Sequence, residues 1–378
     1  MFPLLTLAYK LLVNDRAKFT ALTVGLTFSV FLMVLVTSMF VGIMQRASAT
    51  VLNTGAPMWV MDPAVTTVAN SIPMPDYVLD AVRSMNGVRY AVPLYSGGGL
   101  VKLDTGTYQS VTVLGLDDTT LFGRPYLLEG KIEDLYADDA FIVVRDTEFT
   151  KLNNPKLGAT FEINDHRGVV VGIAEVPVSS LFGIPTLYTT YRRAIEDIPS
   201  ARFTLTYVLV QPKNAAAVPE ILRQVHELGY RALTAQGFRS QITSFYIYQT
   251  GVGTNILIMT IVSFLVGLSI SGQTFYTFIL ENLERFGALK AIGARSYELI
   301  SIILFQAVLT GLTGYGLGVG LCALVIALAK LRLPDYAAML TYLNLGLAFM
   351  MVLIIAGVSG YVGVRKVIRV EPFDVFRS

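Results

Sequence analysis

Four long uncharged apolar runs constrain this chain more than any other feature. A helix that crosses a bilayer needs about 20 consecutive apolar residues, and each run exceeds that length. The runs are Phe19 to Gln45, Ser240 to Leu280, Leu299 to Ala329 and Tyr336 to Val364. Of the 378 residues, 53% are hydrophobic and only 15% are charged, and the mean hydropathy is +0.58. Soluble domains carry more charge, so part of this chain must lie in a membrane.

The first two runs differ in character. The run at 19–45 follows basic residues, as a signal peptide does, but its apolar core is longer than the roughly 15 residues of a cleavable segment. We therefore expect an uncleaved first span. The run at 240–280 starts with a polar and aromatic stretch, which predicts a stalk or interfacial belt followed by a second span that begins near Thr254.

Basic residues near the span ends predict the orientation. The cytoplasmic candidates are the flanks and loops richest in Lys and Arg: Lys10, Arg16, Lys18, Arg285, Lys290, Arg295, Arg365, Lys366, Arg369 and Arg377. The short 330–335 loop holds only Lys330 and Arg332. Both termini and the 281–298 loop are therefore predicted inside, and residues 46–239 outside.

The predicted layout has eight parts. In order these are an interfacial amphipathic helix at 1–18, a span at 19–45, an external domain at 46–239, a stalk and span at 240–280, a cytoplasmic loop at 281–298, spans at 299–329 and 336–364, and a cytoplasmic tail at 365–378. The fold class is an α+β membrane protein with four transmembrane helices and one large α+β extracytoplasmic domain between the first two.

The external domain alternates helix and strand signals. Residues 73–94 and 218–234 each predict a helix followed by a strand, and short β-rich runs stand at 109–116, 139–146 and 168–176. The glycines at 97–99 predict a hairpin turn. The alternative is two subdomains with a break near 115–125. The apolar stretch at 181–191 predicts a strand with its turn, or else a loop that contacts a partner.

Several function classes are excluded or disfavoured. One cysteine, Cys322, allows no intramolecular disulfide, and two separated histidines without a cluster of carboxylates argue against a metal site. No P-loop motif is present, so ATP cannot bind this chain in that way. A net charge of +2 gives no sign of nucleic-acid binding. We find no catalytic constellation, and we expect no enzyme activity and no cofactor in this chain.

The stretch at 281–299, ENLERFGALKAIGARSYEL, stands between two spans and predicts a short helix. Phe286, Leu289 and either Ile292 or Gly293 share one face, which gives an apolar ridge for a partner. Glu281 can pair with Arg285. Gly293 is placed to end the helix, and Ser296 with Glu298 can cap the next one. The alternative is an ordinary cytoplasmic turn.

The third span carries two small-xxx-small pairs, Gly314 with Gly318 and Gly316 with Gly320. Such pairs allow close helix packing within a bundle or across a homodimer. Lipid-facing glycines are the alternative. None of the spans has a charged residue in its middle, which argues against an ion path or a proton relay.

The layout and the 281–298 loop together resemble the permease subunits of MacB/FtsX-type ABC transporters. The specific match is Glu284 followed by Leu289, Lys290, Ala291, Ile292, Gly293 and Ala294. Residues 157–176 and the C-terminal VEPFDVFRS are weaker similarities. A single external domain without a fused ATPase is most similar to the DevC-type exporters.

The resemblance implies a bacterial inner-membrane permease that couples ATP hydrolysis in a separate ABC ATPase, which binds ATP and Mg, to motion of the external domain. It implies export of a hydrophobic or amphipathic substrate, a homodimer, and possible membrane-fusion adaptor and outer-membrane duct partners. The implied coupling residues are Glu281, Glu284, Arg285, Phe286, Leu289, Lys290 and Gly293. Alternatives within the family are an FtsX-like regulator of an envelope enzyme and a permease that extracts lipoproteins or lipids.

Overall fold

The computed structural model describes residues 2–14, 16–103, 105–197, 205–333 and 336–368. The chain divides into two compact units, a helical unit of Met1–Gly42 with Val252–Ser378 and an external unit of Ile43–Gly251. The predicted class is confirmed, because the mixed α+β unit follows the first long apolar helix and precedes the other three. The predicted C-terminal similarity at 370–378 lies outside the described residues.

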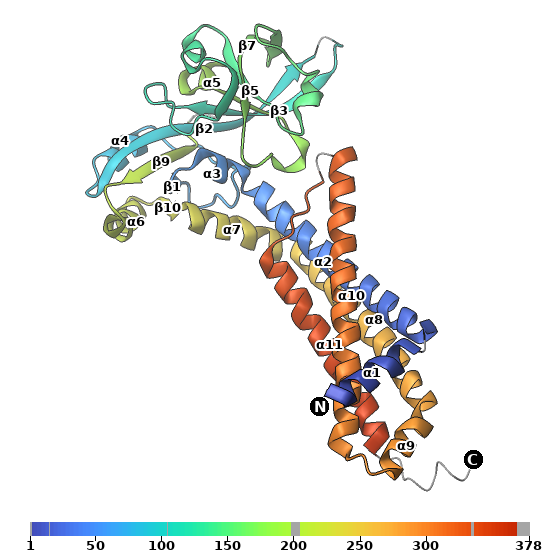
Figure 1. Ribbon diagram of the computed structural model, residues 1–378. Coiled ribbons are helices and arrows are strands. Elements are labelled where there is room, and N and C mark those ends of the chain that lie inside the picture. The colour runs from blue at the N-terminus through green and yellow to red at the C-terminus, as the bar shows by residue number, and fades with distance from the viewer. Residues whose placement is uncertain (1, 15, 104, 198–204, 334–335, 369–378) are drawn as a thin grey trace. The chain divides into compact units, whose positions relative to one another are not determined.

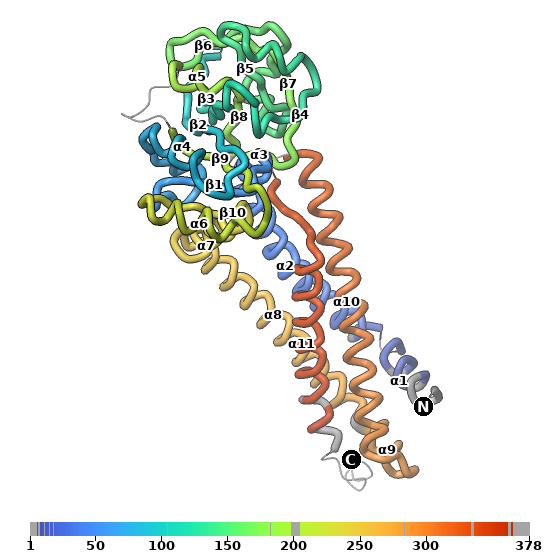
Figure 2. Tube along the Cα trace, turned by 90° about the vertical axis from the view of Figure 1, so that its left-hand side faces the viewer, coloured from blue at the N-terminus to red at the C-terminus, as the bar shows by residue number. Residues whose placement is uncertain are grey.

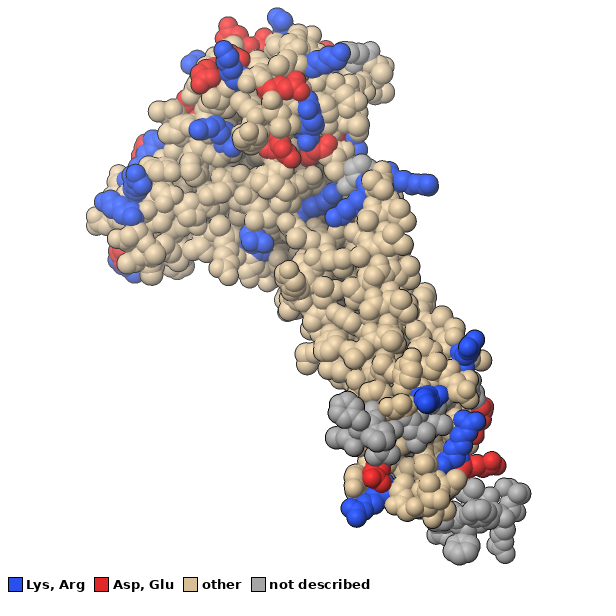
Figure 3. All heavy atoms as spheres, in the orientation of Figure 1, with Lys and Arg blue, Asp and Glu red and all other residues tan. Residues whose placement is uncertain are grey.

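The helical unit contains the predicted spans (Figure 2). Its helices are α1 (Phe2–Asn14), α2 (Arg16–Ala47), α8 (Val252–Glu281), α9 (Leu283–Ala291), α10 (Ser296–Arg332) and α11 (Tyr342–Ile368). In the described part of the chain, four helices, α2, α8, α10 and α11, are long and apolar enough to cross a membrane. Over the middle of these helices, Figure 3 shows an uncharged band on the face in view.

Small residues bring α2 and α8 together. The Ser29 hydroxyl donates to the Ser263 carbonyl at 2.7 Å, and a Cβ at Gly267 would overlap the Ser29 side chain. Both serines are buried. Short side chains and interhelical hydrogen bonds of this kind replace the hydrophobic effect as the source of helix association in lipid.

The fourth span starts later than predicted, at Tyr342 rather than Tyr336. The Thr341 hydroxyl accepts from the Asn344 backbone N–H at 3.3 Å and so caps the helix. Before that point the chain packs on α2: the Met339 N–H donates to the Ser38 carbonyl at 3.0 Å, and Gly42 leaves room for the backbone of Ala337. Hydropathy alone cannot separate such an apolar non-helical segment from the helix that follows it.

The external unit is built on one sheet (Figure 1). Its strands are β1 (Met58–Met61), β2 (Val88–Lys102), β3 (Tyr108–Leu116), β4 (Tyr126–Gly130), β5 (Ala140–Val144), β6 (Thr160–Ile163), β7 (His166–Glu175), β8 (Thr186–Thr190), β9 (Tyr207–Pro212) and β10 (Arg231–Thr234). Its helices are α3 (Ala49–Thr54), α4 (Tyr77–Arg83), α5 (Tyr191–Asp197), α6 (Val218–Glu227) and α7 (Ala235–Tyr248), with 3-10 turns η1 (Ile132–Tyr136), η2 (Phe149–Leu152), η3 (Leu181–Gly183) and η4 (Ala215–Ala217).

The strand order is β10-β1-β9-β2-β3-β8-β5-β7-β4, with β6 pairing both β2 and β7. The long strand β2 pairs β9 through its first half and β3 through its second half. The sheet therefore runs without a break at 115–125 within the described residues. Residues 97–99 lie inside β2, so the predicted hairpin turn there is wrong; Gly97 is needed because the Tyr95 ring covers it.

Strands β1 and β9 are buried on both faces, because their side chains alternate between two cores. In β9, Tyr207 and Leu209 face the core that contains Phe238 of α7, while Val208 and Val210 face the core under α4 and α6. This explains why these strands read as continuous apolar runs.

The stretch predicted as a stalk lies in α7, a helix of the external unit. Gly251, with φ +74°, separates α7 from α8.

Candidate functional site at the turn between α8 and α10

Asn282 forms the corner between α8 and α9. Its side chain is 4% exposed and uses both ends: Nδ2 donates to the Phe278 carbonyl at 2.8 Å, and Oδ1 accepts from Arg285 Nη1 at 2.9 Å. The first bond closes the last turn of α8 and the second ties α9 to it. The angle between the two helices is therefore held by a buried polar residue that the sequence analysis did not single out.

Gly293 ends α9 as predicted. It has φ +102°, the left-handed conformation that glycine adopts without strain. The Gly293 N–H donates to the Lys290 carbonyl at 3.2 Å, and the Ala294 N–H donates to the Leu289 carbonyl at 2.9 Å. These two bonds define a Schellman motif, which satisfies carbonyls that the helix end would leave unpaired.

The start of α10 follows three residues later. The Glu298 carboxylate accepts from the Arg295 backbone N–H at 2.8 Å, so its predicted capping role is confirmed. Ser296 is the first residue of the helix and not the residue before it, so its predicted capping role is wrong. The Asn282 corner and the Glu298 cap fix both ends of α9, which is therefore a short rigid link between the membrane helices α8 and α10.

Phe286 is only 2% exposed and packs inside the helical unit. Its cluster combines side chains from four helices: Ala8, Leu12, Phe278, Ile279, Leu299, Ile302 and Ile303, with Leu289 and Ala294 packed beside them. The part of the predicted apolar ridge that Phe286 and Leu289 form therefore faces the bundle and not a partner. A docking role for Phe286 is wrong for this conformation, because the bundle already covers the ring; the residue positions α9.

The exposed surface of the turn includes Ile292, the alternative third member of the predicted ridge, and residues outside the ridge. Ile292 is 82% exposed at the tip, and Tyr297 is 58% exposed at the start of α10. Glu281, Glu284 and Arg285 are exposed, and Lys290 is half-buried. The pairing of Glu281 with Arg285 stays a prediction. The two apolar side chains thus stand exposed among charged residues.

A buried glutamine links α1 to this cluster. Gln306 of α10 has no exposed surface, and its Nε2 donates to the Ala8 carbonyl at 2.9 Å. Ala8 and Leu12 are fully buried, so α1 is docked on α10 through one face. Within the segment predicted at 1–18, the structure has a helix at Phe2–Asn14, and residues 16–18 already belong to α2. The first helix also belongs to the core of the turn region. A lone glutamine in an apolar span was the available signal.

We expect Gln306→Leu to stabilise the docking of α1 by about 1 kcal/mol. The Gln306 Oε1 atom finds no hydrogen-bond partner among the described residues, and a buried unpaired acceptor costs about 1–3 kcal/mol. Thermal unfolding of the purified chain measures the effect. Gln306→Ala is the control, because it leaves a cavity and should destabilise. Equal destabilisation by both variants would show that the bond to Ala8 outweighs the unpaired acceptor.

The four glycines of α10 divide between two faces. A Cβ at Gly314 would lie 2.9 Å from Leu26 Cβ, and one at Gly318 would lie 2.7 Å from Val30 Cβ. A Cβ at Gly316 or Gly320 would meet nothing within 4 Å. The first pair therefore packs against α2, and the second pair lies on an exposed face of the helical unit.

Family models match both units of the chain. The model described as MacB-like periplasmic core domain matches residues 20–228, more than half of the chain, and the model described as FtsX-like permease C-terminal matches residues 257–372. The chain belongs to the MacB/FtsX-type ABC transporter permeases. The turn at α9 lies within the second match, between the first two spans of the permease's C-terminal part.

Individual proteins similar to this chain include two permeases and one solved periplasmic region. The permease is 27% identical to the uncharacterised ABC transporter permease Rv0072 of Mycobacterium tuberculosis, over 96% of this chain and 95% of that one. It is 24% identical to the putative hemin transport permease HrtB of Staphylococcus haemolyticus, over 41% and 42%. The solved periplasmic region of MacB from Actinobacillus actinomycetemcomitans aligns with 50% of this chain and 94% of its own, at 13% identity and a TM-score of 0.37.

Membership of the family has direct consequences. The permease is a multi-pass membrane protein and works with an ABC ATPase subunit. Within the described residues, no group of three or more His, Cys, Asp or Glu could hold a metal ion.

Proposed function

We propose that this permease couples ATP hydrolysis by a separate ATPase subunit to motion of its external unit, and so exports a hydrophobic or amphipathic substrate. The observation that best supports this function is the packing of α9. A rigid nine-residue helix is joined to two spans, anchored by Phe286 in a four-helix cluster, and exposes Ile292 at its tip. A push on that tip is transmitted to α1, α8 and α10 together.

The sidedness that this function needs follows from the basic residues. Both termini and α9 lie on the cytoplasmic side of a bacterial inner membrane, where the ATPase and its ATP and Mg are found, and the external unit lies outside. The coupling set is Glu281, Glu284, Arg285, Phe286, Leu289, Lys290 and Gly293. Within it we assign positioning to Phe286, Leu289 and Gly293, and we add Ile292 and Tyr297 as the contact surface.

A homodimer is part of the proposal. Gly316 and Gly320 leave a smooth face on α10 that the helical unit does not use, and small residues are typical where two membrane helices meet. In a bacterium with two membranes, a membrane-fusion adaptor and an outer-membrane duct would complete the export path. An apolar bundle without central charges and a relative named for hemin transport favour a hydrophobic or amphipathic substrate.

The test is recovery of the ATPase with tagged permease from native membranes. We expect Ile292→Asp to reduce the recovered ATPase about tenfold or more, because central interface residues carry most of the binding energy. Leu331→Asp is the matched control, since Leu331 is 79% exposed at the opposite end of α10. Equal recovery with both variants would remove Ile292 from the contact surface. Absence of any ATPase with the unmodified chain would overturn the coupling function itself.

A further inference from the structure

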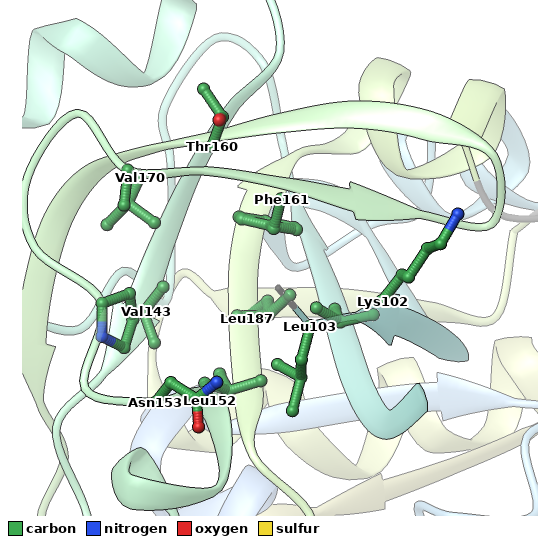
Figure 4. A pocket seen from close by; sticks show the side chains of 12 residues that line it. Lys102, Leu103, Val143, Leu152, Asn153, Thr160, Phe161, Val170 and Leu187 are labelled. Carbon is green, nitrogen blue, oxygen red and sulfur yellow. The ribbon is translucent and has the colours of Figure 1, made fainter. Parts of the chain in front are cut away.

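A cavity of about 90 Å³ opens into the core between β2, β5, β7 and β8 of the external unit (Figure 4). Most of its wall is apolar, and the residues that form it include Val101, Val143, Leu152, Phe161, Val170 and Leu187. Protein cores are packed as densely as organic crystals. An open apolar space among core side chains departs from this packing density and is therefore a candidate binding site.

The mouth of the cavity is held open by a pinned loop. Between η2 and β6 the chain passes through Asn153, with φ +60°, and Gly158, with φ +79°. The Gly158 N–H then donates to the Val170 carbonyl at 2.7 Å, and the Val170 N–H donates to the Ala159 carbonyl at 2.9 Å. Because these bonds tie the rim to β7, the cavity is preformed, as binding sites usually are.

Phe161 forms the wall between this cavity and a wider hollow. Its ring covers Gly168, where any Cβ would overlap it, and meets the Phe141 ring edge-on with 5.4 Å between centroids. The wider hollow, of about 490 Å³, shares Lys102, Leu103, Thr160 and Phe161 with the cavity. An apolar cavity and a polar recess thus lie side by side and share one rim.

The recess carries both signs of charge. Lys102 Nζ lies 3.1 Å from Glu162 Oε2, and this hydrogen bond raises the pKa of the lysine. Asp165 and Arg167 also line the recess, with His166, whose Nδ1 is 3.6 Å from Asp197 Oδ1. An anionic lipid headgroup would meet two carboxylates here. A polypeptide segment with mixed charges would find partners of both signs.

We propose that this site accepts a single leucine-sized aliphatic side chain from a protein partner, with the flanking residues of that partner lying in the charged recess. Pockets for drug-sized ligands have volumes of about 300–1,000 Å³, so the cavity is too small for one. An apolar centre with a polar rim is the usual anatomy of a protein interface. The inference goes beyond the proposed function and needs neither the ATPase nor the exported substrate.

The experiment measures protection of a cysteine at the rim in the full chain, embedded in lipid nanodiscs. Thr160→Cys is made together with Cys322→Ala, which removes the only native cysteine; Thr160 is exposed and lines both hollows. The probes are acetyl-Lys-Leu-Glu-amide, acetyl-Lys-Ala-Glu-amide and sodium hexanoate, each at millimolar concentrations. We expect the leucine peptide to slow maleimide labelling at about one-tenth of the alanine peptide's concentration, since burying the larger side chain favours binding by that factor.

A second set of variants, at Ala159, tests the effect of filling the cavity. Ala159→Leu should abolish protection by the leucine peptide, while Ala159→Ser, at the same place without added volume, should keep it. Three results would overturn the proposal: no protection by the leucine peptide, equal protection by the alanine peptide, or unchanged protection in Ala159→Leu. Equal protection by hexanoate would assign the site to acyl chains instead. If Ala159→Leu does not fold, the comparison of the three probes on Thr160→Cys still decides.

Discussion

Replacing Phe286 with alanine is expected to destabilise the helical unit by about 3–5 kcal/mol, the range for large-to-small changes at buried aromatic positions. The ring is 2% exposed and joins side chains of α1, α8 and α10 in one cluster. Its removal would leave a cavity where these helices converge, and α9 would lose its anchor. Unfolding of the purified chain in detergent, followed by circular dichroism of the helices, measures the loss.

The matched control for Phe286→Ala is Ile292→Ala, six residues along the same turn. Ile292 is 82% exposed, and exposed substitutions usually change stability by no more than about 0.5 kcal/mol. Under the proposed function this control keeps the fold but weakens ATPase binding. If the two variants destabilise the chain equally, Phe286 is not the anchor that the packing indicates.

Gly318→Ala should cost about 1–3 kcal/mol, the usual range for overpacking a tight contact. The new Cβ would lie 2.7 Å from Val30 Cβ and 2.8 Å from the Thr27 backbone carbonyl oxygen. A backbone atom cannot move aside as the end of a flexible side chain can, so α2 and α10 must separate. The same unfolding measurement reports the effect.

Gly316→Ala is the control for the α10 contact, two residues away in the same helix. Its Cβ would meet nothing within 4 Å, so we expect no loss of stability in the isolated chain, and a gain of up to about 1 kcal/mol from the higher helix propensity of alanine. A loss at Gly316 as large as that at Gly318 would contradict the division of the four glycines between two faces. Both variants gain the same helix propensity, because alanine replaces glycine inside α10 in each, and the comparison therefore isolates the packing contact.

The features that depend on local pattern could be predicted from the sequence. The spans follow from long uncharged runs, the end of α9 from a glycine that can adopt positive φ, and the strand at 186–190 from its β-rich composition. The strands at 109–116 and 168–176 could be predicted in the same way, from short β-rich runs. In each case the deciding pattern lies within one continuous segment of the chain.

Features decided by distant contacts could not be predicted. The face of α9 that carries Phe286 was recognised, but only the fold shows that this face is covered by α1 and α10. Residues 97–99 looked like a turn because three glycines favour one, yet pairing with β3 keeps them extended. Likewise Asn282 and Gln306 acquire their roles from partners that the periodicity of a sequence does not reveal.

The pairing of β1 with β10 has a mechanical consequence. The chain enters the sheet of the external unit through β1, after α3, and leaves it through β10, before α7; these strands are antiparallel neighbours, with Met58 opposite Thr234. The two connections therefore leave from the same end of one ladder. A load that pulls them apart would act on the hydrogen bonds of this ladder one after another. A load that moves them together strains none of its bonds, so the whole sheet is carried along as a single body.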